Sequence, residues 1–176
     1  MEAKLSRARG FTAYELLVVV GLAALLATLA VPGFGSLRRA AGLSAATNQL
    51  IWALHFARSS AVLRGVPAAV CLSADDHTCM NSAGSLATGW LVFHTESQHA
   101  MAQPVGAAPL LHSFRLPADV TVTGTRPVVT FWPVARAGTT GTFNLCDVSG
   151  RSPGRAVVVS QTGRPRVSAE AAACAS

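Results

Sequence analysis

The residues with the clearest chemical potential in this 176-residue chain are arginines near its C-terminal end. Between residues 126 and 166 there are six arginines and one acid, Asp147. A guanidinium presents a planar fork of N–H donors that can bind two phosphate oxygens at once. This stretch is therefore a candidate phosphate-binding surface, and an ordinary solvated basic face is the alternative. The six residues are Arg126, Arg136, Arg151, Arg155, Arg164 and Arg166.

The segment 157–167 predicts a strand, a turn at Gly163 and an extended return. Pro165 fixes its own φ and biases Arg164 toward extended geometry. Residues two apart in an extended chain project to the same side. Arg164 and Arg166 would therefore extend in the same direction from backbone positions roughly 6–7 Å apart. We expect these two side chains to lead the contact with phosphates, with Arg151 and Arg155 in support.

Four cysteines fall in two pairs, Cys71 with Cys79 and Cys146 with Cys174. An even number of cysteines outside the cytoplasm predicts two disulfides, although four cysteines allow three connectivities. The alternative is a zinc site that uses Cys71, His77 and Cys79. That spacing matches no standard set of zinc ligands, so the sequence favours Cys71–Cys79 and Cys146–Cys174 disulfides and no metal.

No residue pattern predicts catalysis or a cofactor. The five histidines have no partnered motif, and the serines near residue 150 lack the frame of a nucleophile elbow. Asp75 and Asp76 lack the further oxygen ligands of a calcium loop, which favours a solvated turn. We therefore expect a protein that is not an enzyme and holds no cofactor.

The N-terminal segment combines an acid with a long apolar run. No charged residue occurs from Leu16 to Leu37, which is long enough for a membrane-crossing helix, yet Glu15 stands at its entrance. Basic residues at positions 4, 7 and 9 precede the run and predict that the N-terminus is cytoplasmic and that everything after Leu37 lies across the membrane. A secretory signal cleaved after Ala30 is the alternative, but it would place the acid inside its apolar core.

The rest of the chain predicts an α+β fold. Pro32 and Gly33 are expected to interrupt the helix, and an apolar stripe over 38–65 predicts an amphipathic second half that ends at Gly65. Short strand patterns then follow one another, which predicts an antiparallel β head over 66–176 packed on that helix. The expected strands are 68–72, 89–93, 110–115, 120–123, 128–132, 142–146 and 156–160.

The stretch from Gly10 to Leu17, Gly-Phe-Thr-Ala-Tyr-Glu-Leu-Leu, resembles the class III signal of type IV pilins and pseudopilins. The resemblance implies that a prepilin peptidase removes a leader, 1–10, by cutting between Gly10 and Phe11 and then methylates Phe11. It also implies an assembly and transmembrane helix over 11–37. In that family the acid at the position of Glu15 pairs with the amino terminus of a neighbouring subunit, which would give the buried charge a partner.

A short head that ends in Gly-Arg-x-Arg before a last cysteine resembles the GspH, FimT and FimU group of minor pilins and pseudopilins, and FimT most of all. The resemblance implies that Gly163, Arg164 and Arg166 bind extracellular double-stranded DNA during natural transformation. It implies other pilins as partners and a single-pass inner-membrane protein with a periplasmic head that later enters a pilus or pseudopilus fibre. A purely structural subunit of a pilus tip or a type II secretion system is the alternative.

Overall fold

The structure is a computed structural model that describes residues 11–95, 110–133, 139–172 and 174, and of residues 29–33 it describes the backbone alone. Gly10 and Arg136, both singled out by the sequence, lie outside the described residues. The chain divides into two compact units, residues 1–37 and 38–176, with helix α1 (Ala13–Arg64) contributing to both.

Helix α1 begins with a reciprocal cap. The backbone N–H of Glu15 donates to the Thr12 hydroxyl oxygen at 3.2 Å, and the backbone N–H of Thr12 donates to the Glu15 carboxylate at 3.3 Å. This is the capping box expected of a Thr-x-x-Glu sequence. At the other end Gly65 adopts a φ of +66°, a left-handed conformation that ends helices and suits glycine, so the predicted stop at Gly65 is confirmed.

The predicted interruption at Pro32 and Gly33 is wrong, because α1 is assigned as one helix of 52 residues through both positions. Proline already has a helical φ and deprives the helix of one backbone hydrogen bond while the bonds on either side remain. Among the residues that the structure describes, no helix holds a segment long and apolar enough to cross a membrane.

The first sheet has the strand order β3-β2-β1-β5, and every neighbouring pair is antiparallel. Its strands are β1 (Ala68–Ser73), β2 (Gly89–His94), β3 (Leu110–Arg115) and β5 (Val128–Phe131). Every residue of β1 and β2 is buried, so these central strands are covered on both faces. The Cys71–Cys79 disulfide, with Cα atoms 5.5 Å apart, packs with Leu91 and Phe93 in a small second core.

The second sheet has the order β4-β6-β7-β8 and is also antiparallel throughout. Its strands are β4 (Val120–Gly124), β6 (Gly141–Asp147), β7 (Gly154–Val159) and β8 (Pro165–Ala172). In β6 the buried residues alternate, and Phe143 and Leu145 of this strand lie with Val157 and Val159 of β7 on the inner face. Strand β8 is an edge strand, which is where a proline such as Pro165 is tolerated.

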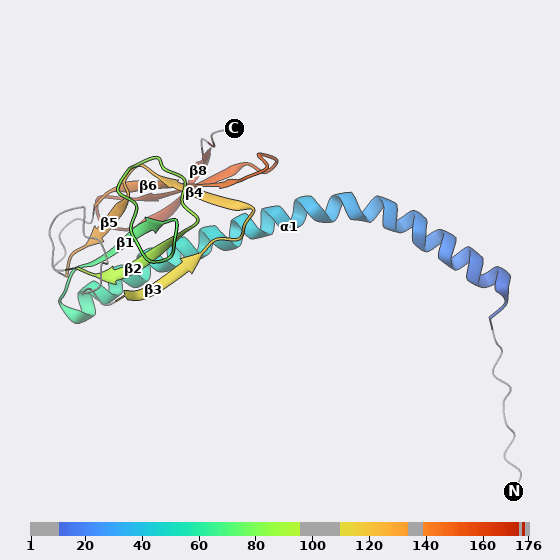
Figure 1. Cartoon of the computed structure of the whole chain (residues 1–176), viewed down its shortest axis with the longest axis horizontal. Coiled ribbons are helices and arrows are strands. Elements are labelled where there is room, and N and C mark those ends of the chain that lie inside the picture. Colours follow the sequence, from blue (N-terminus) through green and yellow to red (C-terminus); the bar gives the residue numbers. More distant parts are fainter. Residues whose placement is uncertain (1–10, 96–109, 134–138, 173, 175–176) are drawn as a thin grey trace, which may run out of the picture. The chain divides into compact units, whose positions relative to one another are not determined.

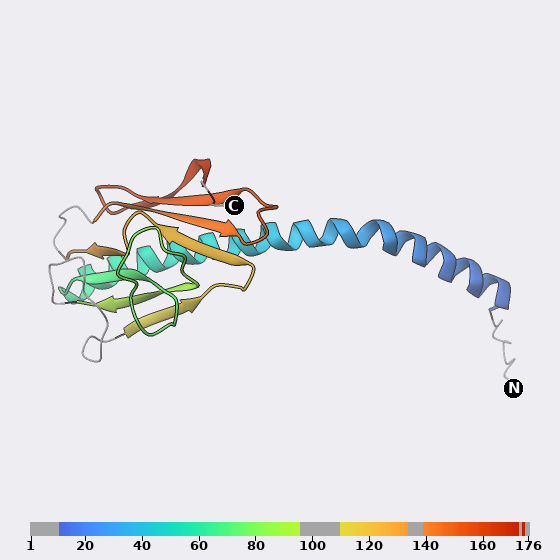
Figure 2. The same ribbon diagram turned by 45° about the horizontal axis from the view of Figure 1, so that its top comes forward.

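The main core joins the second half of α1 to both sheets (Figures 1 and 2). Leu43, Leu50 and Leu54 of the helix pack with Trp90 of one sheet and Phe143 of the other. All the buried residues that the structure describes, and both disulfides, belong to 38–176. This unit, which we call the head, therefore has its own complete core, as an independently folding domain requires. The expected α+β fold is confirmed.

Candidate nucleic-acid interface

The turn between β7 and β8 is a tight three-residue hairpin loop. The Gly163 N–H donates to the Ser160 carbonyl at 2.8 Å, and the Ser160 N–H donates to the Arg164 carbonyl at 3.1 Å. Gly163 has a φ of +72°, which completes a tight turn of the kind that closes with a left-handed residue. The sequence prediction of a turn at Gly163 is confirmed, and the turn is pinned further because the Arg164 N–H donates to the Ser160 hydroxyl oxygen at 3.2 Å.

Arg164 and Arg166 project from this turn into solvent. Arg166 is aligned with Val158 of β7, and the bonds between Ser160 and Arg164 continue the same ladder one residue further. By the alternation of a strand, both arginines share the face of the sheet that lies opposite the core residues Val157 and Val159. Both are exposed, and neither has a carboxylate within ion-pair distance among the residues that the structure describes.

A third arginine, Arg58 of helix α1, joins the turn from the other side. Its Nη1 donates to the Gly163 carbonyl oxygen at 3.4 Å across a sequence separation of 105 residues. Sequence reasoning missed Arg58, because it lies in a helix far from the basic stretch. The only signal in the sequence was that Arg58 stands beside the apolar stripe of the helix. That position does not indicate which strand lies next to the arginine. We call Gly163, Arg164, Arg166 and Arg58 the arginine turn.

Arg151 and Arg155 lie elsewhere. Arg155 is aligned with Leu145 and Ala171 near the start of β7, and Arg151 is in the preceding turn, whereas the arginine turn follows the end of β7. Most of the six-residue strand β7 separates Arg155 from the turn, a distance of roughly 17 Å along the strand. The structure therefore does not bring together all four arginines that the sequence grouped; they form two groups at opposite ends of one strand.

The end of the sheet that carries Arg151 is fixed by a carboxylate and a disulfide. Asp147 accepts hydrogen bonds from the Ser149 hydroxyl at 2.8 Å and from the Ser149 and Ser152 backbone N–H groups, and these bonds lower its pKa from the ordinary value. The Cys146–Cys174 disulfide links the strands on either side of β7, with Cα atoms 5.7 Å apart. It passes so close to Gly154 that a Cβ there would lie 2.3 Å from the Cys174 sulfur.

The paired cysteines match the sequence prediction, and they also exclude the zinc alternative for Cys71 and Cys79, whose sulfurs are bonded to each other. Asp75 forms the predicted solvated turn: its carboxylate accepts the backbone N–H groups of His77 and Thr78 at 2.9 and 2.7 Å. The Thr78 hydroxyl, with these N–H groups, lowers the pKa of Asp75 well below its ordinary value. Within the described residues, the one ion pair joins Asp76 to Arg115.

The processing and assembly residues lie in the first unit, and their roles remain predictions. Phe11 is 83% exposed, and Glu15 is exposed while it caps α1. Apolar side chains are exposed around this part of the helix, including Leu17, Val19 and Leu26. A helix that is apolar on all sides is stable when other protein or lipid covers it.

Comparison with known families and structures agrees with this architecture. Residues 46–163 match the family model described as type II transport protein GspH. Two crystal forms of the type IV minor pilin FimU of Pseudomonas aeruginosa share the fold. One has 19% identity and a TM-score of 0.52 over 73% of this chain and 96% of that one, and the other has 20% identity and a TM-score of 0.52 over 74% and 92%. No curated protein matches the chain.

Proposed function

The chain belongs to the GspH family, as a minor pilin or pseudopilin of the type IV pilus or type II secretion kind, and we propose that it binds double-stranded DNA through the arginine turn. The family match and the fold support the assignment to the minor pilins and pseudopilins. The DNA-binding part rests on the turn itself.

One observation carries the proposal: Arg164 and Arg166 extend from one side of a turn whose Gly163 carbonyl accepts a hydrogen bond from Arg58, and no carboxylate among the described residues forms an ion pair with any of the three. Like charges gathered at one place repel each other, and a bound anion relieves that repulsion. Arg164 and Arg166 share one face of an extended strand, which suits two phosphates along a DNA backbone. Contacts to phosphates alone carry no sequence information, so the binding is expected to be non-specific.

We further propose how the subunit reaches a filament. A prepilin peptidase cuts between Gly10 and Phe11 and methylates Phe11, and the apolar helix over 11–37 holds the protein in the inner membrane with the head in the periplasm. The exposed apolar side chains of that helix and the acid at Glu15 support this proposal. The helix then leaves the membrane for a fibre built from other pilins, where neighbouring helices cover it.

The test is a titration of fluorescently labelled duplex DNA with the oxidised head, Arg38–Ser176. Non-specific phosphate contacts typically give a dissociation constant of about 10⁻⁴–10⁻⁶ M at physiological salt. Each of Arg164→Gln and Arg166→Gln should weaken binding about fivefold at ~0.15 M salt, which is the contribution of one phosphate contact. Arg151→Gln and Arg155→Gln are matched controls, because they remove the same charge at the opposite end of β7.

Equal losses in all four variants would mean that bulk charge attracts the DNA, and the turn would not be the site. A structural subunit of a pilus tip or of a type II secretion pseudopilus is the second candidate, and the match to GspH favours it. Wild-type heads that bind no duplex at low salt would establish that second function in place of the first.

A further inference from the structure

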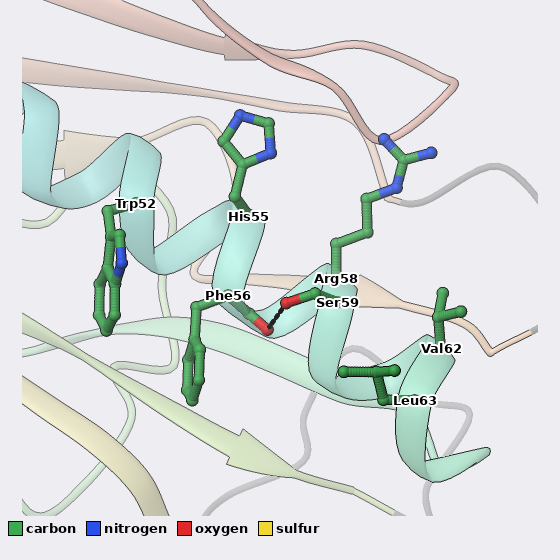
Figure 3. Close-up of a pocket in the computed structure, with 7 residues that line it drawn as sticks. All are labelled: Trp52, His55, Phe56, Arg58, Ser59, Val62 and Leu63. Carbon is green, nitrogen blue, oxygen red and sulfur yellow. Dashed lines mark hydrogen bonds between the residues drawn. The ribbon is translucent and has the colours of Figure 1, made fainter.

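A groove on the outer side of helix α1 lies directly beside the arginine turn. It has a volume of about 590 Å³ and is lined by side chains of one helical segment (Figure 3). The lining residues are Trp52, His55, Phe56, Arg58, Ser59, Val62 and Leu63. All of them belong to the head.

One wall of the groove is aromatic. The rings of Trp52 and Phe56 are stacked, with centroids 5.1 Å apart and planes inclined by 6°, and His112 of β3 meets Trp52 edge-on at 5.2 Å. Trp52 is nevertheless 52% exposed, although a tryptophan gains stability from burial. Figure 3 shows the two rings projecting in parallel from the same side of the helix. Each ring covers one face of the other, and the exposed half of Trp52 remains open to solvent as a surface on which a flat ring can stack.

The opposite wall is cationic. Figure 3 shows Arg58 extending from the other side of the helix toward the neighbouring loop, where it donates to the Gly163 carbonyl. Arg58 therefore belongs both to the groove and to the arginine turn. Exposed polar residues, His55 and Ser59, lie on the helix surface between the two walls.

We propose that this groove takes an unpaired nucleobase from a DNA strand whose phosphates are held at the arginine turn. The inference rests on the proposed DNA binding and names the form of DNA that the site prefers. An aromatic platform beside a basic track is the arrangement with which proteins bind single-stranded nucleic acid, because every base has a face that stacks. In an intact duplex the bases are stacked on one another, so the platform serves strand ends, gaps and tails.

Charge decides between this occupant and an apolar segment of a neighbouring subunit. A purely apolar partner would have to cover Arg58 and His55 without an acid to pair with them, and burying an unpaired charge is costly. A nucleotide satisfies both walls, because its phosphate faces the guanidinium and its base faces the rings. The span between the walls is about one helix width, roughly 10 Å, which one or two nucleotides of an extended strand can cross.

The experiment compares a short blunt duplex with the same duplex carrying a single-stranded thymidine tail, both titrated against the oxidised head. Stacking of one base should make the tailed duplex bind about tenfold more tightly than the blunt one. Trp52→Leu should abolish this preference while leaving the affinity for the blunt duplex unchanged, and Trp52→Phe should retain it because the ring remains. The tail should also quench tryptophan fluorescence in the wild-type head and not in Trp52→Leu, which keeps both the buried Trp90 and the half-buried Trp132.

Equal affinity of the wild-type head for both duplexes, or a tail preference that survives in Trp52→Leu, would overturn the groove as a base site. The proposed function would survive either result, provided that Arg164→Gln and Arg166→Gln still lower the affinity of the head for the blunt duplex. Concentration-dependent dimers of the wild-type head that disappear in Trp52→Leu would assign the groove to a second subunit and would likewise overturn the inference.

Discussion

At the scale of single residues, Glu15 combines two roles that a suitable substitution can separate. Its carboxylate caps α1 through Thr12, and as a charge it is proposed to pair with the amino terminus of a neighbouring subunit. Glu15→Gln keeps an acceptor for the cap, since glutamine also serves in capping boxes, but removes the charge. If the charge drives assembly, Glu15→Gln and Glu15→Ala should both be depleted in sheared filaments.

Quantitative immunoblots of sheared filaments and of membranes provide the measurement, with cleavage of the leader as the control for normal insertion. Thr12→Ala is the matched control, because it removes the hydroxyl of the cap and keeps the acid. Assembly of Glu15→Gln at wild-type levels would show that the cap, and not the charge, is what matters at this position.

The candidate site was predictable from the sequence in part. Gly163, Pro165 and the flanking valines gave the turn and the shared side of Arg164 and Arg166, because these are local consequences of backbone geometry. Local geometry could not show that Arg58 reaches the same turn, nor that Arg151 and Arg155 lie at the far end of β7. Both facts depend on strand register and helix packing, which a single sequence does not state.

At the scale of elements, Gly154 is where the second sheet leaves no room for a side chain. A Cβ there would lie 2.3 Å from the Cys174 sulfur and 3.1 Å from the Leu145 carbonyl oxygen. Gly154→Ala should therefore destabilise the head by about 1–3 kcal/mol, as overpacking does in cores. Thermal unfolding should show a lower midpoint, by roughly 2–4 °C for each kcal/mol.

Gly42→Ala is the control for Gly154→Ala, since the nearest atom to a Cβ at residue 42 is the Asp119 Oδ2 at 4.0 Å and the site is helical. It should leave the midpoint unchanged or raise it, because alanine favours a helix over glycine. A Gly154→Ala head as stable as wild type would contradict the close passage of the disulfide over β7.

The connection between β1 and β2 should make the head sensitive to acid. Hydrogen bonds to the carboxylate of Asp75 lower its pKa in the folded state, so the unfolded chain binds the proton more tightly. The stabilisation is present above the ordinary pKa of an aspartate and is lost as the pH falls through the lower folded value. Thermal midpoints measured from pH 6 to about pH 2 should decrease more steeply for wild type than for Asp75→Asn.

Parallel curves for the two proteins would show that the hydrogen bonds of Asp75 do not contribute to this pH dependence. The second contributor, Asp147, has a pKa shifted in the same direction, so Asp75→Asn should reduce the slope without abolishing it.

Most of the fold was predictable at this scale, and the exceptions have physical causes. The strands occur where short β-branched and aromatic runs stand between turn residues, as with Val128–Phe131 and Gly154–Val159. The interruption at Pro32 was not observed: α1 continues through this residue, because proline's φ fits a helix and only one backbone hydrogen bond is lost. The pairing of β1 with β5, and the division into two sheets, arise from contacts between distant residues that periodicity does not encode.

At the scale of the whole molecule, the processing proposal predicts the mass of the mature protein. Protein purified from membranes of a host with a prepilin peptidase should begin at a methylated Phe11, and intact-mass spectrometry measures this directly. Gly10→Leu should leave the longer precursor in the membrane, because the glycine is the expected cleavage position. A chain that begins at Val31 would instead establish cleavage as an ordinary secretory signal.

The central claim, that the arginine turn holds the backbone of DNA, is tested most directly by the salt dependence of binding. Three phosphate contacts to duplex DNA predict that the logarithm of the association constant falls with the logarithm of the salt concentration with a slope of about −2.7. For the Arg164→Gln/Arg166→Gln double variant the slope should be close to −1, because Arg58 alone remains. A double variant that keeps the wild-type slope would contradict the claim.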